Sequence, residues 1–118
     1  MKVGIIGSRG FNNYELVKEV MGDYLNRDNE LNCELVVSGG AKGADTLGEQ
    51  WAKENNIPTL IFKPEWDKYG KSAGFRRNQD IVKNCDMVVA FWDGVSKGSK
   101  SSIDLCVKLG ILVRIVDY

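Results

Sequence analysis

The sequence predicts an α/β protein with a Rossmann-like fold, a three-layer α/β/α sandwich around a mainly parallel five-stranded sheet. Two observations carry this prediction. Short apolar runs alternate with longer segments of helical period along the whole chain, a pattern typical of parallel strands joined by helices. The apolar runs also lack a regular polar–apolar alternation, so we expect helices to cover both faces of the sheet.

Five short apolar runs are the expected strands. In chain order, they comprise residues 3–6, 34–38, 57–62, 86–91 and 111–116. Runs this short, bounded by glycine or polar residues, favour strands over buried helices. Pro58 lies near the start of the third run, where the loss of one ladder hydrogen bond is tolerated.

Four segments with apolar residues at helical spacing separate these strands. In chain order, they lie near residues 12–25, 44–52, 73–84 and 101–109. Asn12 and Asn13 are good N-cap residues for the first helix, and Glu15 follows Asn12 as in a capping box. Polar loops at residues 63–72 and 92–100 are expected before the third and fourth helices.

The length and charge of the chain exclude several function classes. The 118 residues fit a single domain, which we place at residues 1–118. The 16 basic and 16 acidic side chains cancel, which argues against a general nucleic-acid binder. Because the chain has no histidine, it can form neither a Ser-His-Asp or Cys-His catalytic site nor a zinc site that uses histidine.

The cysteines and the apolar runs indicate where the protein works. Cys33, Cys85 and Cys106 are odd in number and widely spaced, which predicts neither a disulfide framework nor a four-cysteine metal site. We expect no bound metal. The first apolar run is much shorter than the core of a signal peptide, and no run approaches a membrane span. The expected location is the cytoplasm, without a membrane partner.

Three of the expected loops carry small residues, hydroxyls and cations where strands end. The carboxyl ends of parallel strands share one edge of the sheet, where open α/β proteins bind ligands. Glycines let backbone N–H groups approach a phosphate, and the following helix adds a favourable dipole. One such loop is most simply a tight turn, but three at one edge predict an anionic ligand. The candidate binding residues in these loops are Gly7, Ser8, Arg9, Ser38, Gly39, Gly40, Ala41, Lys42, Gly43, Asp45, Trp92, Asp93, Gly94, Ser96, Gly98 and Ser99.

The segment after the third strand adds three candidate residues. Trp66 can stack on a base or pack beneath its loop, and both interpretations stay open. Arg77 and Asn78 fall near the start of the third helix, hence near the binding edge. An arginine there suits pairing with a phosphate, and an asparagine suits a hydrogen bond to the ligand or to a loop.

Two common phosphate-binding motifs are absent. Glu65 stands where a Walker A motif that ends at Gly70-Lys71 would need its first glycine. Gly39-Gly40-x-x-Gly43 has the wrong first spacing for the dinucleotide motif. An ordinary P-loop ATPase or NAD dehydrogenase is therefore disfavoured.

Four motifs in order, GSR, SGGAKGAD, PEW…YGKSAGFRRN and AFWDGVSKGS, resemble the small YspA-like, DUF2493-type branch of the SLOG superfamily. The similarity covers nearly the whole chain. The superfamily is Rossmann-like and includes the LOG "lysine decarboxylase-like" phosphoribohydrolases and the DprA-type DNA-processing proteins. The resemblance implies a bacterial or phage protein whose glycine-rich loops bind nucleotides or nucleotide-derived ligands such as ADP-ribose. It also implies pairing of the domain into a homo-oligomer.

The chain departs from the catalytic LOG enzymes at one place. Those enzymes resemble one another in a P-G-G-x-G-T-x-E-E loop whose glutamate acts in N-glycosidic cleavage, and this chain has Ser101 and Ser102 at the two glutamate positions. Asp45 and Asp93 remain as candidate catalytic bases. More simply, they orient ribose hydroxyls or cap the neighbouring backbone.

These observations favour a binding protein for a nucleotide-derived, ADP-ribose-like small molecule, acting as sensor, carrier or sequestering protein. No cofactor is certain. The alternative is an enzyme, a nucleotide phosphoribohydrolase or a related N-glycosidase. A third hypothesis is handling of single-stranded DNA, which the balanced charge disfavours.

Overall fold

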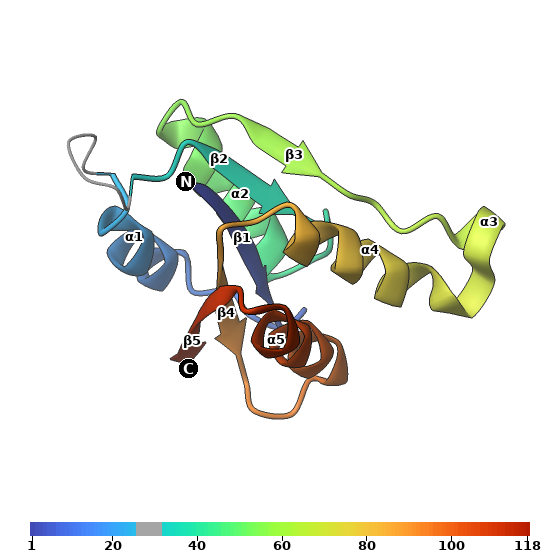
Figure 1. The fold of residues 1–118 in the computed structure, drawn as a ribbon. Coiled ribbons are helices and arrows are strands. Elements are labelled where there is room, and N and C mark those ends of the chain that lie inside the picture. The colour runs from blue at the N-terminus through green and yellow to red at the C-terminus, as the bar shows by residue number, and fades with distance from the viewer. Residues whose placement is uncertain (26–31) are drawn as a thin grey trace.

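A computed structural model describes residues 1–25 and 32–118 and confirms the Rossmann-like α/β/α fold (Figure 1). The sheet has the order β3-β2-β1-β4-β5, and every neighbouring pair is parallel. The strands are β1 (Lys2–Gly7), β2 (Leu35–Ser38), β3 (Thr59–Ile61), β4 (Met87–Trp92) and β5 (Leu112–Asp117). The strand order reverses between β1 and β4, and such a switch point opens a crevice for ligands at the carboxyl edge.

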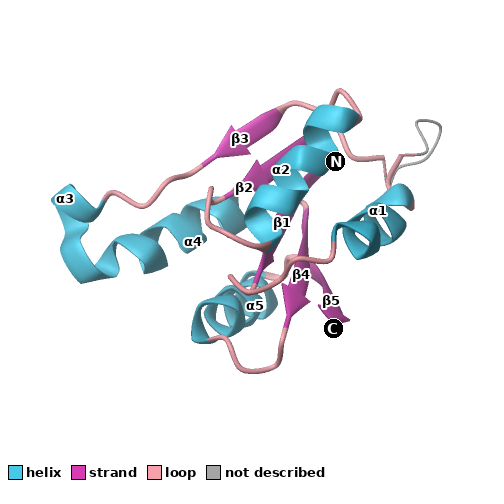
Figure 2. Cartoon of the chain, turned by 180° about the vertical axis from the view of Figure 1, so that it is seen from behind, coloured by secondary structure: helices cyan, strands magenta, loops and turns pink. Residues whose placement is uncertain are grey.

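Two helices pack on each face of the sheet, as Figures 1 and 2 show from opposite sides. One face carries α1 (Tyr14–Gly22) and α2 (Ala44–Glu54), and the other carries α4 (Ala73–Lys83) and α5 (Lys97–Leu109). The short helix α3 (Trp66–Tyr69) and the 3₁₀ turn η1 (Gly70–Ser72) directly precede α4 and lie at its N-terminal end. They extend the molecule beyond the sheet in both views.

Each helical layer buries its own apolar cluster against the sheet. Trp51 of α2 and Phe91 of β4 belong to the first cluster, and Ile81 of α4 and Cys106 of α5 belong to the second. These four side chains are at most 1% exposed. Full burial of a phenylalanine or isoleucine side chain stabilises a fold by about 1.5–3 kcal/mol. Trp51 and Cys106 therefore belong to the core of the protein.

The start of α5 differs from the prediction, which placed Lys97, Gly98 and Ser99 in a loop. The carboxylate of Asp93 accepts hydrogen bonds from the N–H groups of Val95 and Ser96, both at 2.8 Å. These bonds close the turn early, so α5 begins at Lys97 instead of residue 101. The expected loop at residues 63–72 is likewise largely helical.

The N-terminal cap of α1 also differs in detail from the prediction. Asn13 is the N-cap residue, and its side-chain oxygen accepts a hydrogen bond from the N–H of Leu16 at 3.1 Å. Counted from Asn13, Glu15 is the second residue of the helix, one position too early for a capping box. The helix nevertheless starts where an asparagine cap predicts.

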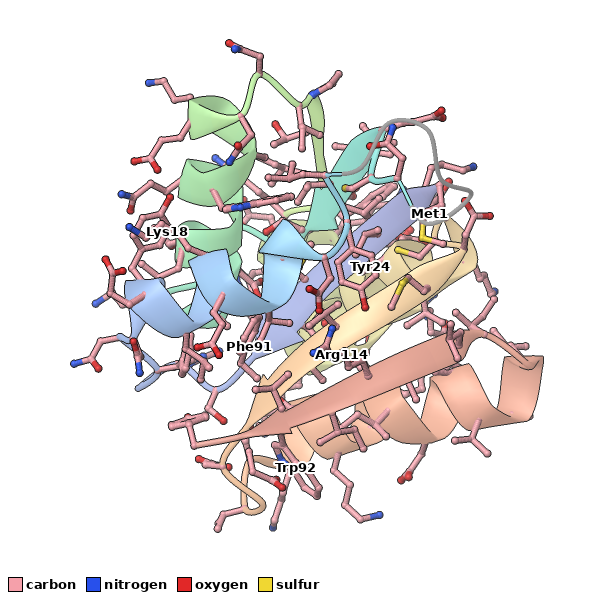
Figure 3. The ribbon with its side chains drawn as sticks, turned by 90° about the vertical axis from the view of Figure 1, so that its left-hand side faces the viewer. Met1, Lys18, Tyr24, Phe91, Trp92 and Arg114 are labelled. Carbon is pink, nitrogen blue, oxygen red and sulfur yellow. The ribbon has the colours of Figure 1, made fainter. Side chains whose placement is uncertain are left out.

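The expectation that helices cover the whole sheet is wrong for the two edge strands. Leu60 of β3 is 38% exposed, and Leu112 and Ile115 of β5 are 60% and 45% exposed. An apolar run looks the same whether its strand lies at the centre or at the edge, so the sequence pattern could not separate them. Arg114 instead ties β5 to the end of α1, where its guanidinium points towards the ring of Tyr24 (Figure 3) and donates a 3.2 Å hydrogen bond to the hydroxyl.

The three cysteines are free thiols in the interior. Burial raises the pKa of Cys33 to about 11 and that of Cys85 to about 12. Within the described ranges, no helix combines the length and the apolar character that crossing a membrane requires. The same residues contain no group of three or more cysteine, aspartate or glutamate side chains that could hold a metal ion.

Candidate anion-binding site at the sheet edge

Two adjoining hollows lie at the carboxyl edge of the sheet. The first, here called the inner cavity, has a volume of about 90 Å³ and lies between the end of β1, the loop after β2, and the starts of α4 and α5. The second, the outer groove, has a volume of about 580 Å³ and extends from the loop after β2 to Lys63, Pro64 and Trp66. Arg9, Ala41 and Arg77 line both hollows. The inner cavity holds the volume of about three water molecules, comparable with one phosphate group.

Arg77 stands where the two hollows meet, and the fold fixes its position. Its Nη1 donates a 2.7 Å hydrogen bond to the carbonyl of Gly39, and its Nε donates a 2.8 Å bond to the side-chain oxygen of Asn78. Burial lowers the pKa of Arg77, Asp45 opposes that shift, and Arg9 adds to it. A guanidinium stays charged in proteins and has five N–H donors, so Arg77 keeps donors for a ligand.

Asp45, at the start of α2, is 6% exposed and lines the inner cavity. Its Oδ2 accepts hydrogen bonds from the N–H groups of Gly39 at 3.2 Å and Ala41 at 3.4 Å. Burial raises the pKa of Asp45 to about 6, against the effects of Ala41, Arg77 and Gly39, while Glu49 raises it further. The site therefore contains a carboxyl group whose pKa lies well above its usual range.

The loop after β2 is closed on itself rather than open to a ligand. Asp45 satisfies the amides of Gly39 and Ala41, and the amide of Gly40 donates to the Ser38 hydroxyl at 3.4 Å. Ser38 is fully buried, and its own hydroxyl donates to Glu49 at 2.7 Å. The protein's own side chains thus use these three amides and the Ser38 hydroxyl, while Gly39, Gly40 and Ala41 also line the outer groove.

Gly43 packs the loop after β2 against the loop after β1. Its backbone has φ of +84°, which only glycine adopts easily. A Cβ atom there would lie 2.4 Å from the carbonyl oxygen of Ser8 and 2.6 Å from that of Arg9. This close approach brings Arg9 to the hollows that Ala41 and Arg77 also line.

At the start of α5, backbone donors have no acceptor among the described residues. The first N–H to make an intrahelical hydrogen bond is that of Lys100, which donates to Ser96 at 3.1 Å. The amides of Lys97, Gly98 and Ser99 precede it, and such amides, together with the helix dipole, favour an anion. Gly98 and Ser99 line the inner cavity, and a Cβ on Gly98 would meet nothing within 4 Å.

The two serines at the LOG glutamate positions differ in placement. Ser102 is 3% exposed and lines the inner cavity, whereas Ser101 does not line it. A hydroxyl therefore stands in the cavity where a carboxylate would stand in the enzymes that the sequence resembles.

Ser96, in the loop after β4, lines the inner cavity, whereas the predicted residues Ser8, Trp92, Asp93 and Gly94 shape this loop without lining either hollow. The hydroxyl of Ser8 accepts a hydrogen bond from the Asp93 N–H at 3.3 Å, and the indole N–H of Trp92 donates to Ser96 at 3.0 Å. Asp93 is exposed, and its hydrogen bonds from Ser96 and Val95 lower its pKa. Gly94, with φ of +81°, completes the turn. These residues, with Trp92 and Asp93 foremost, position the start of α5.

Four cations and one carboxylate line the two hollows together: Arg9, Lys42, Lys63, Arg77 and Asp45. Trp66 borders the outer groove and is 53% exposed, so its ring is open to a flat ligand. The electrostatic character of the site is therefore positive, although the whole chain has no net charge.

The sequence-based candidates omitted several residues that line the hollows: Ile6, Lys63, Pro64, Ile81 and Ser102. Lys63 follows the third strand at the same edge as the other loops, so its position carried a usable signal. Ile81 lies four residues after Arg77 on α4, and helical spacing places the two on one face.

Comparison with known proteins supports the fold and identifies relatives. The sequence model of the family described as YAcAr, "YspA, cpYpsA-related SLOG family", matches residues 1–69. The Gene 61 protein of Mycobacterium phage D29 is 32% identical over an alignment of 118 positions, which covers 95% of this chain and 93% of the phage protein. DNA processing protein A (DprA) from Streptococcus pneumoniae has a similar fold, with a TM-score of 0.80 at 22% identity. That match covers 99% of this chain but only 50% of DprA, so this chain spans about half of the DprA length.

Proposed function

The chain belongs to the YspA, cpYpsA-related SLOG family, and we propose that it binds a nucleotide-derived small molecule with a phosphate group in the inner cavity. The observation that carries the proposal is the convergence of Arg9, Arg77 and the free amides of α5 on a hollow of about 90 Å³. Charged donors and helix amides together are the usual partners of a bound phosphate. A phosphate would use the charges of both arginines, neither of which forms an ion pair among the described residues.

The outer groove supports a ligand larger than inorganic phosphate. It is about six times the volume of the inner cavity, and Arg9, Ala41 and Arg77 line both hollows. Lys42 and Lys63 suit a second phosphate, and the exposed ring of Trp66 suits a base. An ADP-ribose-like molecule, with a diphosphate between two ribose units, offers groups for both hollows.

Binding without turnover is better supported than N-glycosidic cleavage. Ser102 lies in the cavity where the LOG glutamate would be, and Asp93 is exposed and occupied with the loop backbone. The one carboxylate that lines the hollows, Asp45, already accepts two amide hydrogen bonds. The protein would then act as a sensor, carrier or sequestering protein for its ligand.

Calorimetric titration with AMP, ADP, ribose 5-phosphate and ADP-ribose tests this function, with two neighbouring arginines as a matched pair. Arg77→Gln should weaken binding by at least tenfold, since a hydrogen bond to a charged group contributes about 1.5–3 kcal/mol. Arg76→Gln should change the affinity by less than about twofold. The Arg76 guanidinium lies 4.3 Å from the Tyr69 ring centre and lines neither hollow.

The same samples distinguish the alternatives. Chromatography after long incubation should return the ligand unchanged, whereas a released base would establish an enzyme instead. Single-stranded DNA should give no salt-sensitive mobility shift. Absence of binding across the whole panel would reject the proposed function.

A further inference from the structure

The inner cavity contains a feature that conflicts with simple anion binding. Asp45 is a buried carboxyl group that lines the same hollow of about 90 Å³ as the two arginines. A carboxylate and a phosphate dianion that share so small a space repel each other strongly, because burial removes the water that would screen them. If the cavity binds a phosphate, as proposed above, the negative charge of Asp45 must be neutralised.

The two oxygens of Asp45 have different environments. Oδ2 accepts the amides of Gly39 and Ala41. Oδ1 has no hydrogen-bond donor among the described residues. Every fully buried side-chain oxygen among these residues does have a partner, so Oδ1 must be accessible from outside the protein. Because the residue lines the inner cavity, this free oxygen is the one that a ligand can meet.

Some groups around Asp45 favour its charged carboxylate form, and others favour its neutral acid form. Arg77 of α4 and the Gly39 and Ala41 amides favour the carboxylate. Glu49, one turn further along α2, and burial favour the neutral acid, and Arg9 lines the cavity from the loop after β1. The resulting pKa of about 6 lies within reach of neutral pH. A dianion placed beside the carboxyl group adds negative charge there, which favours the neutral acid further.

We propose that Asp45 couples anion binding in the inner cavity to the uptake of one proton. The proton comes from the solvent and binds Oδ1, while Oδ2 keeps its two amide bonds. The neutral acid then donates its O–H to an oxygen of the bound dianion. Asp45 thereby changes from a repelling group to a third donor beside Arg9 and Arg77. This assigns to the cavity a tetrahedral dianion, such as a phosphate monoester, that binds more tightly as the pH falls.

Sulfate is the sharpest probe, because it remains a dianion throughout the pH range that matters and any pH dependence then reports the protein. Its affinity, measured by calorimetry from pH 5.5 to 8.5 at constant ionic strength, should fall by about tenfold per pH unit above the pKa of Asp45. Titrations at pH 8 in two buffers of different ionisation enthalpy should give an uptake of about one proton per bound sulfate. Ribose 5-phosphate should behave in the same way at pH 8.

Asp45→Asn supplies the decisive variant, since the amide oxygen can keep the two amide bonds and the NH₂ group can donate to the anion. Its sulfate affinity should vary by less than about threefold over the same pH range, with no proton uptake. Asp104→Asn is the matched control, because Asp104 pairs with Lys100 on the exposed side of α5. That variant should retain the pH dependence of the wild-type protein.

The outcomes separate this inference from the proposed function. Sulfate binding without proton uptake, or with equal pH dependence in wild type and Asp45→Asn, would overturn the role of Asp45 and leave the proposed function intact. No binding of sulfate or of any phosphate compound at any pH would overturn both. If circular dichroism shows that Asp45→Asn does not fold, the proton count on the wild-type protein decides.

Discussion

Two glycine-bearing segments at the same edge of the sheet differ in how closely the surrounding protein packs against them. The loop after β2, residues 39–43, is filled from within, and a Cβ on Gly39 would lie 2.6 Å from Arg77 and 2.9 Å from Asp45. The start of α5 is open, and a Cβ on Gly98 would meet nothing within 4 Å. Both segments follow strands and contain small residues, a lysine and serine or glycine donors. A glycine-rich loop thus serves internal packing or ligand access according to the side chains around it.

The neighbour that decides is the first carboxylate or hydroxyl inside the following helix. In α2 it is Asp45, whose carboxyl group takes the amides of the loop. In α5 the residues with a side-chain hydroxyl that line the cavity are Ser99 and Ser102, and the amides before Lys100 keep no partner within the helix. The Asp45 carboxylate thus takes up the donors of the loop after β2, while the donors at the start of α5 are left for an anion from outside the protein.

The largest expected effect is at the closed segment. Gly43→Ala should lower the free energy of unfolding by about 4 kcal/mol or more, because the new Cβ meets two backbone carbonyls at a positive φ. Chemical denaturation measures the loss. Gly22→Ala is the control: it ends α1, where a Cβ meets nothing within 4 Å, and it should change stability by less than about 1 kcal/mol. A loss below about 1 kcal/mol in Gly43→Ala would contradict the close packing of the two loops.

A smaller effect, with a definite pH dependence, is expected at Asp45. The folded state raises the pKa of Asp45 to about 6, from about 4 in an unfolded chain. Folded protein therefore binds this proton more tightly, and the contribution of Asp45 to the stability of the wild type falls as the pH rises from about 4 to about 6 and stays lower above that. An asparagine side chain cannot ionise, so Asp45→Asn should gain about 3 kcal/mol relative to wild type between about pH 4 and pH 7.

Denaturation curves of both proteins at several pH values measure this gain, and the other carboxyl groups cancel in the difference. Asp104→Asn, at an exposed ion pair, should show a difference from wild type that changes little with pH. A difference between Asp45→Asn and wild type that is constant over this pH range would show that the carboxyl group titrates normally in the folded protein.

The contrast between these segments also marks what a sequence can predict. The fold and the position of Arg77 near the binding edge follow from strand ends and helical phase, which are properties of residue order. The direction of Ser38 does not, because it depends on Glu49, eleven positions away, accepting its hydroxyl. The exposure of Leu112 is equally hidden, since an edge strand and a central strand share one apolar pattern. The direction and exposure of such side chains depend on contacts between distant residues, which the sequence pattern does not contain.

The smallest effect on stability, but a distinct effect on binding, is expected at the open segment. Gly98→Ala should raise the free energy of unfolding by up to about 1 kcal/mol, because alanine favours a helix and the new Cβ has free space around it. The same methyl group lies at the amides that we expect a phosphate to approach, so affinity for ribose 5-phosphate should fall by about tenfold. Thermal unfolding and calorimetry on one sample measure both, and Gly22→Ala should leave the affinity unchanged. If Gly98→Ala binds as tightly as wild type, the anion does not approach the start of α5, and the open segment serves the fold as the closed one does.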